Sequence, residues 1–199
     1  MIKESGFGFC FSQGSAIKFD DTPYYRKCFV SFPAAKGVDI LYKDQGQLVL
    51  LEIKNCKGHE ADNRWRIDPD NKKAHLAPED SHDRDSLDIE IAQKVAMTIA
   101  CLIGAVTTGV ENGAANSIIP YANMLVDKGI STKEKNLLII LLLEGDFGGR
   151  TRTKKMQMES LQVSLRKKLR WLNCTVSVVD SNTYNKKLFT LLDDPPKTL

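Results

Sequence analysis

The sequence lacks the cysteine and histidine spacings that mark disulfide-rich and zinc-binding proteins. Its five cysteines are odd in number and include no Cys-x-x-Cys pair, which argues against a disulfide framework and against a structural zinc site. Its three histidines, His59, His75 and His82, fall in one polar stretch, and no two of them are four residues apart. We interpret the cysteines as reduced thiols of a cytoplasmic protein and the histidines as solvated loop residues.

The sequence also lacks a hydrophobic run that predicts a membrane span. The most apolar stretch, residues 91–110, contains Gln93, Lys94 and three threonines, so we expect it to form a buried helix. The polar N-terminal residues are followed by an apolar segment that is too short for a secretory signal. We therefore expect a soluble protein with no membrane partner.

The net charge is small, +3 over 199 residues, but charges of each sign gather in different segments. Residues 79–90 contain six acidic residues and one basic residue, whereas residues 150–170 contain eight basic residues and one acidic residue. Such asymmetry is typical of a protein that binds a polyanion with one face.

The basic segment has two parts. The first follows a glycine pair at residues 148–149, and we expect it to form a loop that binds the phosphates of nucleic acid; a solvated surface is the alternative for each residue. The candidate nucleic-acid-binding residues in this first part are Arg150, Arg152, Lys154 and Lys155. The second part, residues 166–170, lies opposite the apolar stripe of a predicted helix, and we interpret it as a solubilising surface.

The length predicts a single domain, residues 1–199. Apolar runs predict strands at residues 25–32, 38–43, 47–54, 136–143 and 174–179, and helical periods predict helices at residues 86–103 and 153–172, with a short helix around residues 121–126. Residues 1–17 are expected to form a short helix or an arm, and residues 57–86 a long polar loop insertion. Antiparallel strands followed by helix–strand units predict an α/β fold, a mixed β-sheet flanked by helices.

The most informative segment is the strand predicted at residues 47–54. It is apolar on both faces, as buried central strands are, yet it contains Glu52 and Lys54. These two side chains project from the same face because side chains alternate along a strand. If residues 45–46 form a two-residue turn, Asp39 on the preceding strand lies directly opposite Glu52. Two carboxylates and an ammonium group then converge on one buried face.

These residue types predict a particular chemistry. Adjacent carboxylates repel each other when they are ionised, and a divalent cation that binds both relieves the repulsion. Mg²⁺ suits Asp39 and Glu52 because it takes one or two carboxylates, keeps several waters and bridges to phosphate oxygens. Lys54 would orient the attacking water or stabilise the developing negative charge. The pattern therefore indicates metal-assisted hydrolysis of a phosphodiester; a structural ion pair between Glu52 and Lys54 is the alternative.

The order of these residues resembles the PD-(D/E)XK nuclease superfamily. In that superfamily an acidic residue on one strand precedes Asp/Glu-x-Lys on the next, and here Gly37-Val38-Asp39 is followed by a hairpin and Leu51-Glu52-Ile53-Lys54. The resemblance implies a restriction-endonuclease-like core and catalytic roles for Asp39, Glu52 and Lys54. It also implies that Asp39 and Glu52 bind Mg²⁺, or Mn²⁺ in its place.

The resemblance suggests three further site residues. The superfamily often draws an additional carboxylate from upstream, which makes Asp21 a candidate metal ligand; a turn at residues 20–23 is the alternative. In several of its branches a glutamine or lysine on the helix after the motif contacts phosphate, so Gln93 and Lys94 are candidate catalytic residues. A surface pair between Glu90 and Lys94 is the alternative for that lysine.

Together these features predict a Mg²⁺-dependent nuclease that hydrolyses DNA or RNA, with DNA favoured. Trp65 and Arg66, in the polar insertion, are candidates for stacking on a base, with packing of the loop as the alternative. The resemblance suggests that a partner protein or a homo-oligomer supplies recognition, within a defence or restriction-type system. Two alternatives stay open: a catalytically inactive nuclease-like fold that binds nucleic acid or serves in assembly, and a purely structural α/β domain.

Overall fold

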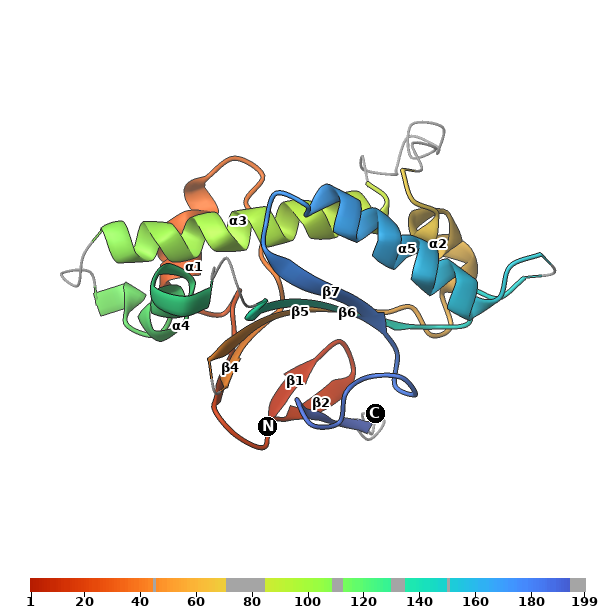
Figure 1. Ribbon diagram of the computed structural model, residues 1–199, viewed down its shortest axis with the longest axis horizontal. Helices are drawn as coiled ribbons and strands as arrows, with labels where there is room; N and C mark the ends of the chain where they lie inside the picture. Colours follow the sequence, from red (N-terminus) through yellow and green to blue (C-terminus); the bar gives the residue numbers. More distant parts are fainter. Residues whose placement is uncertain (45, 71–84, 109–112, 130–134, 150, 194–199) are drawn as a thin grey trace, which may run out of the picture.

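The computed structural model describes residues 1–44, 46–70, 85–108, 113–129, 135–149 and 151–193. Within these residues a central mixed sheet has helices on one face and a small antiparallel sheet on the other (Figure 1). The predicted α/β class with a mixed sheet is confirmed. The prediction that helices flank the sheet applies to one face only, because β-strands cover the other.

The five strands of the central sheet lie side by side in chain order: β3 (Ser15–Lys18), β4 (Ile40–Asp44), β5 (Gln47–Asn55), β6 (Leu137–Glu144) and β7 (Cys174–Val179). β3, β4 and β5 are antiparallel neighbours, and β6 and β7 run parallel to β5. Antiparallel neighbours need only a tight turn, whereas parallel neighbours need a crossover connection. Helix α3 (Leu87–Thr107) lies in the first crossover and helix α5 (Lys154–Lys168) in the second.

Shorter elements complete the described part of the chain. The other helices are α1 (Pro23–Lys27), α2 (Glu60–Ile67) and α4 (Ile119–Asn123), with 3₁₀ turns at Phe29–Ser31 and Gly113–Ala115 and a π-helical turn at Met124–Gly129. The small sheet contains β1 (Ile2–Glu4), β2 (Phe7–Cys10) and β8 (Thr190–Asp193), in the order β1-β2-β8. It therefore joins the two ends of the described chain.

The residues of β5 alternate between two hydrophobic cores. Leu48 and Leu50 pack in the core under the helices, and Val49 and Leu51 pack in the core under the small sheet. All four are fully or almost fully buried, and each buried aliphatic side chain contributes about 1.5–3 kcal/mol. The alternation places Glu52 on the helical face, in the layer that contains α3.

Helix α3 is the one described helix long and apolar enough to cross a membrane by length and composition. Its buried residues include Ile91, Val95, Thr98 and Leu102, which recur at three- and four-residue intervals along one stripe. That stripe packs in the core on the helical face of the sheet. The sequence prediction of a buried helix is therefore confirmed in part, because many other residues of α3 are only half-buried.

Several predicted elements are confirmed within a few residues: β4, β5, β6, β7, α3 and α5. Thr153 caps α5, its hydroxyl oxygen accepting a hydrogen bond from the Met156 N–H at 3.3 Å. Ser86 occupies the N-cap position of α3, but its side chain makes no capping hydrogen bond, and its hydroxyl donates to Asp88 at 2.6 Å. Asp88 also accepts from Ser164 at 2.7 Å and pairs with Lys168 at 2.9 Å, so this buried carboxylate joins α3 to α5.

The predicted strand at residues 25–32 is wrong. Pro23 starts the short helix α1, where the missing N–H of proline is not needed. The aromatic residues that suggested a strand pack against one another instead: Tyr25 meets Phe29 at a tilt, and Phe29 stacks on Phe32. The arm or helix predicted for residues 1–17 is also wrong, since this segment contains β1, β2 and β3.

Two other predictions need smaller corrections. The long insertion, residues 57–86, is not all loop because it contains α2, while its residues 71–84 lie outside the described part. The short helix predicted around residues 121–126 appears as α4 and the π-helical turn that follows it.

Candidate active site

The β4–β5 hairpin has the predicted register. Asp44 pairs with Gln47 and Ile40 pairs with Leu51, so Asp39 follows opposite Glu52. Gly46 in the turn has a φ of 88°, a left-handed conformation that glycine adopts without strain. Asp39 is fixed against β5, because its Oδ2 accepts a hydrogen bond from the Ile53 N–H at 2.7 Å.

Helix α3 adds two charged side chains above the hairpin. The Lys94 Nζ lies 2.6 Å from the Glu52 Oε1 and 3.7 Å from the Asp39 Oδ1. The Lys54 Nζ lies 2.9 Å from the Glu52 Oε1 and 2.8 Å from the Glu90 Oε1. Glu90 and Lys94 therefore bind partners on β5, which corrects the alternative that they pair with each other on the helix surface.

Helix α2 supplies a third cation, Arg66, which forms an ion pair with the Glu90 Oε2. Three acids and three bases thus alternate in one chain of contacts, which we call the charge network: Asp39, Lys94, Glu52, Lys54, Glu90 and Arg66. Glu52 is only 1% exposed, and the other five side chains lie between 12% and 19%. So many charges out of water carry a large desolvation penalty, and buried ion pairs often fail to offset it.

Burial and charge shift the pKa values of three members. Burial, together with the neighbouring Glu52, raises the pKa of Asp39 to about 7, although Lys94 and the Ile53 N–H act in the opposite direction. Burial lowers the pKa of Lys54, but Glu52 and Glu90 outweigh it and the net pKa is raised. Burial raises the pKa of Glu90, but Lys54 and Arg66 outweigh it and the net pKa is lowered. With this pKa, Asp39 exchanges its proton near neutral pH.

One oxygen in the network is unsatisfied: the buried Glu52 Oε2 has no hydrogen-bond partner among the described residues. Such an oxygen is unusual in a folded protein, because an unpaired buried polar group destabilises it by about 1–3 kcal/mol. Mg²⁺ fits this donor set, since it is bound by one or two carboxylates and retains water. The described residues contain no group of three or more His, Cys, Asp and Glu residues placed to bind a metal. The two carboxylates therefore suit a cation that keeps most of its water ligands, rather than one enclosed by protein ligands.

The structure does not bring two of the predicted residues into the network. Asp21 forms ion pairs with Lys18 and Arg26, and Lys18 in turn binds Glu4 of β1 at 2.9 Å. These contacts connect Asp21 to the small sheet, on the face opposite to Glu52. The turn alternative therefore describes Asp21 better than a role as metal ligand.

Gln93 also lies outside the network, although it adjoins Lys94 in the sequence. Its Oε1 accepts a hydrogen bond from the Lys36 Nζ at 3.1 Å. Neighbouring residues of a helix point about 100° apart, so one of the two side chains can reach Glu52 while the other does not. Of the two helix candidates, only Lys94 contacts the carboxylates.

The predicted phosphate-binding loop does not form one cationic cluster. Arg152 pairs with Asp68 at 3.3 Å, Lys154 with the buried Asp180 at 2.7 Å, and the exposed Lys155 with Glu159 at 4.0 Å. Arg150 lies outside the described residues. Lys154 therefore stabilises a buried carboxylate. Arg152 and Lys155 are the exposed members of the set, and binding of nucleic acid by them stays a prediction.

The sequence did not reveal that Glu90 and Arg66 belong to the site. From the sequence, Glu90 enters only as the surface partner in the alternative for Lys94, and Arg66 only as a candidate for stacking on a base. The sequence did contain a signal for Glu90: it lies four residues before Lys94, so the two side chains share one side of the helix, next to the apolar stripe that packs on the sheet. Arg66 had no local signal, because its position depends on how α2 packs.

Comparison with known proteins supplies a family and no activity. No curated protein and no solved structure matches the chain. The model of one family matches residues 22–193, a stretch that contains all six members of the charge network. The chain therefore belongs to the Family of unknown function (DUF6661).

Proposed function

We propose that this protein is a metal-dependent nuclease that hydrolyses phosphodiester bonds of nucleic acid, with a restriction-endonuclease-like core. The observation that carries the proposal is the convergence of Asp39, Glu52 and Lys54 on one face of β4 and β5. These residue types in this order, on a hairpin whose second strand is parallel to β6, agree with the resemblance found in the sequence. The unsatisfied Glu52 Oε2 supports a cation as the missing partner.

Asp39 and the Glu52 Oε2 are the groups that would hold Mg²⁺, or Mn²⁺ in its place. When bound, the ion would lower the pKa of a coordinated water and neutralise charge on the phosphate. Asp39 is prepared for this role, because the Ile53 N–H fixes one of its oxygens and leaves Oδ1 facing Lys94.

Lys54 and Lys94 would act on the substrate as fixed cations. Glu52 and Glu90 hold the Lys54 ammonium group between β5 and α3, so its charge is in place before a phosphate arrives. Such preorganised charge stabilises a transition state because it needs no rearrangement. Lys94 lies beside both carboxylates, and its charge would balance a phosphate oxygen next to them.

The remaining parts of the proposal rest on the resemblance. DNA is the favoured substrate and RNA the second choice, and a partner protein or another copy of the chain would supply recognition. A cytoplasmic location and a place in a defence or restriction-type system belong to the same proposal.

A cleavage assay tests the proposal. Purified protein is incubated with double-stranded DNA, single-stranded DNA and RNA in Mg²⁺, Mn²⁺ or EDTA. We expect cleavage with either metal and none with EDTA. Glu52→Gln should abolish it, whereas Glu159→Gln, which removes an exposed carboxylate from α5, should leave it unchanged. If folded protein cleaves none of the substrates with either metal, the nuclease proposal fails.

One observation favours a second candidate, an inactive nuclease-like fold that binds nucleic acid. The ion pairs of the charge network already join every acid to a base without a metal ion. A protein of this kind would bind nucleic acid with equal affinity in EDTA and in Mg²⁺. It would also show no binding of Mg²⁺ at the carboxylates.

A further inference from the structure

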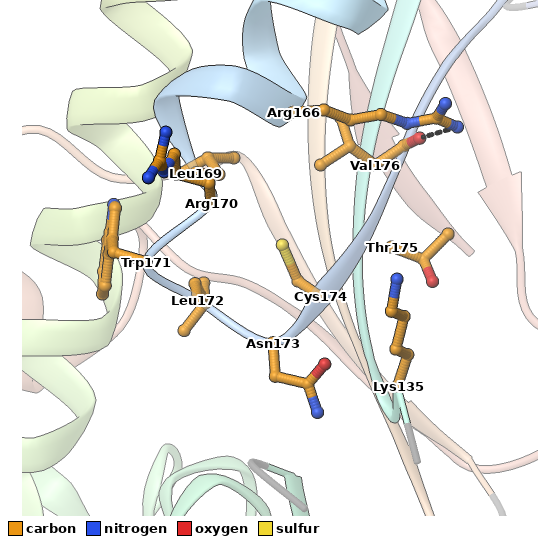
Figure 2. Close-up of a pocket in the computed structure, with 10 residues that line it drawn as sticks. All are labelled: Lys135, Arg166, Leu169, Arg170, Trp171, Leu172, Asn173, Cys174, Thr175 and Val176. Carbon is orange, nitrogen blue, oxygen red and sulfur yellow. Dashed lines mark hydrogen bonds between the residues drawn. The ribbon is translucent and has the colours of Figure 1, made fainter. Parts of the chain in front are cut away.

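A second feature lies at the other end of the central sheet. A cavity of about 540 Å³ opens where α5 ends and β7 begins (Figure 2). Its size falls in the range of small-molecule sites, about 300–1,000 Å³. The ten residues that line it include Lys135, Arg166 and Arg170 but no carboxylate. The cavity is therefore positively charged, although residues 166–170 were interpreted from the sequence as a solubilising surface.

The three cations have no acidic partners in the described part of the chain. The Arg166 Nη2 donates to the Val176 carbonyl at 3.2 Å, which orients the guanidinium group. No ion pair joins Lys135, Arg166 or Arg170 to a described carboxylate. Elsewhere in the structure, basic residues such as Lys54, Lys154 and Lys168 are paired. Cations that line one cavity without acids favour an anionic ligand.

An exposed tryptophan borders the same cavity. Trp171 is 60% exposed, in the turn between α5 and β7. Figure 2 shows Trp171 and Arg170 on one side of the cavity and Lys135 on the other. Aromatic rings beside cationic grooves are the usual platform for bases of single strands, because every base can stack on an aromatic face while the cations bind the backbone.

The cavity is distant from the charge network. Leu137 of β6 pairs with Cys174 of β7 at the cavity, and Leu141 of β6 pairs with Glu52. Four residues separate these two positions along β6, which corresponds to about 13 Å. A ligand in the cavity is therefore not at the proposed reaction centre.

We infer that this cavity is a second, non-catalytic binding site for single-stranded nucleic acid, in which a base stacks on Trp171 and phosphates bind Lys135, Arg166 and Arg170. The choice of nucleic acid rests on the proposed function. An acidic peptide would use the cations but not the ring, and a free nucleotide would use the same chemistry with a single phosphate group.

Tryptophan fluorescence provides a direct test. The chain has two tryptophans, so the Trp65→Phe variant reports on Trp171 alone. In EDTA, where no metal-dependent cleavage occurs, a 15-nucleotide single strand should quench its fluorescence. An oligonucleotide without bases should quench far less, and polyglutamate should not quench. Equal quenching by polyglutamate would overturn the assignment in favour of an acidic partner, and equal affinity for a mononucleotide would overturn the assignment to a strand.

Anisotropy of the labelled strand tests the residues. Trp171→Ala should weaken binding about 5- to 150-fold, the effect expected for loss of one stacked base, and Trp171→Phe should retain most of the affinity. The double variant Lys135→Ala, Arg170→Ala should reduce the slope of log affinity against log salt by about 1.4, at roughly 0.7 per phosphate contact. Lys27→Ala, which removes an exposed lysine from α1, is the matched control and should change neither quantity.

These measurements separate the two proposals. Binding at Trp171 in a protein that never cleaves nucleic acid would refute the nuclease and support the second site. Cleavage by Trp171→Ala together with unchanged strand affinity would support the nuclease and overturn the second site. Circular dichroism of each variant confirms that the fold is intact.

Discussion

At the scale of single residues, the charge network determines the properties of the site. Glu52 is its centre, since Oε1 contacts both lysines and Oε2 has no described partner. Burial and the neighbouring Glu52 raise the pKa of Asp39 to about 7, close to physiological pH. In the metal-free protein an ionised Asp39 is therefore unfavourable beside Glu52, and a proton or a cation that binds there relieves this cost.

Asp39→Asn should stabilise the metal-free protein at high pH. An aspartate in the unfolded chain titrates near 3.8 and Asp39 in the folded protein near 7, so the folded state binds the proton more tightly between these values. The free energy of unfolding of the wild type should therefore fall as the pH rises from about 4 to about 7, and then level off. The amide oxygen of the substituted side chain keeps an acceptor for the Ile53 N–H.

Urea unfolding in EDTA at several pH values measures this effect. At pH 8 the Asp39→Asn variant should be more stable than the wild type by up to about 4 kcal/mol, since each pKa unit corresponds to about 1.4 kcal/mol. Below pH 4 the two should be nearly equal. A variant that is less stable than the wild type at pH 8 would contradict the raised pKa.

Lys54→Met should separate catalysis from metal binding. Methionine fills the volume of the lysine stem but leaves Glu52 and Glu90 without their shared cation. We expect turnover to fall about 10²- to 10³-fold, the usual result of removing one transition-state donor. The free energy of unfolding should fall by about 3–5 kcal/mol, because removing one member of a buried ion pair leaves the other charge buried without its partner.

Two assays follow the Lys54→Met variant: single-turnover cleavage with saturating Mg²⁺, and calorimetric titration with Mg²⁺. Lys54→Arg, which keeps the charge, should recover most of the stability. Turnover of Lys54→Met close to that of the wild type would mean that Lys54 is only a structural partner of Glu52.

At the scale of elements, α5 protects the open edge of the central sheet. Among the described strands β7 pairs only with β6, so its outer backbone groups have no strand partner there. Two side chains of α5 replace that partner: the Arg166 guanidinium donates to the Val176 carbonyl at 3.2 Å, and the Gln162 Oε1 accepts from the Val178 N–H at 2.9 Å. Covered edges of this kind resist pairing with other chains.

Gln162→Ala should expose this edge. We expect a loss of about 1 kcal/mol in the free energy of unfolding, since one backbone N–H loses its acceptor, and more self-association at high protein concentration. Val163→Ala changes the neighbouring exposed residue of the same helix and should alter stability by less than about 0.5 kcal/mol. Equal stability and equal sedimentation of the two variants would show that Gln162 does not protect the edge.

The elements that the sequence predicted well are those with a strong local pattern. β5 and β6 are long buried strands, and α3 and α5 have clear helical periods. β1, β2 and β8 are three or four residues long, and β2 pairs with β8 across almost the whole chain. A pairing between residues so distant in sequence leaves no local signal, and the aromatic run at residues 25–32 imitated a strand.

At the scale of the whole molecule, the part of the site that could be predicted is the part formed by residues close together in sequence. Asp39, Glu52 and Lys54 belong to one hairpin, so turn chemistry and side-chain alternation were enough to bring them together. Glu90 and Arg66 join through the packing of α3 and α2 on the sheet. The cavity at Trp171 likewise depends on how α5 returns to β7.

The two functional candidates share this fold and differ in one property of the whole protein. A nuclease must bind a divalent cation at Asp39 and Glu52, whereas an inactive binding module leaves these carboxylates to Lys54 and Lys94. Cleavage depends on the choice of substrate, but cation binding does not. Metal binding is therefore the more direct criterion.

The deciding measurement is a calorimetric titration with Mg²⁺ at pH 8, where Asp39 is ionised, on the wild type and on Glu52→Gln. We expect the wild type to bind Mg²⁺ and Glu52→Gln to lose this binding, or to bind at least tenfold more weakly, while circular dichroism shows the same fold. No binding by the wild type at millimolar Mg²⁺, or equal affinity in the two proteins, would contradict a metal centre at these carboxylates.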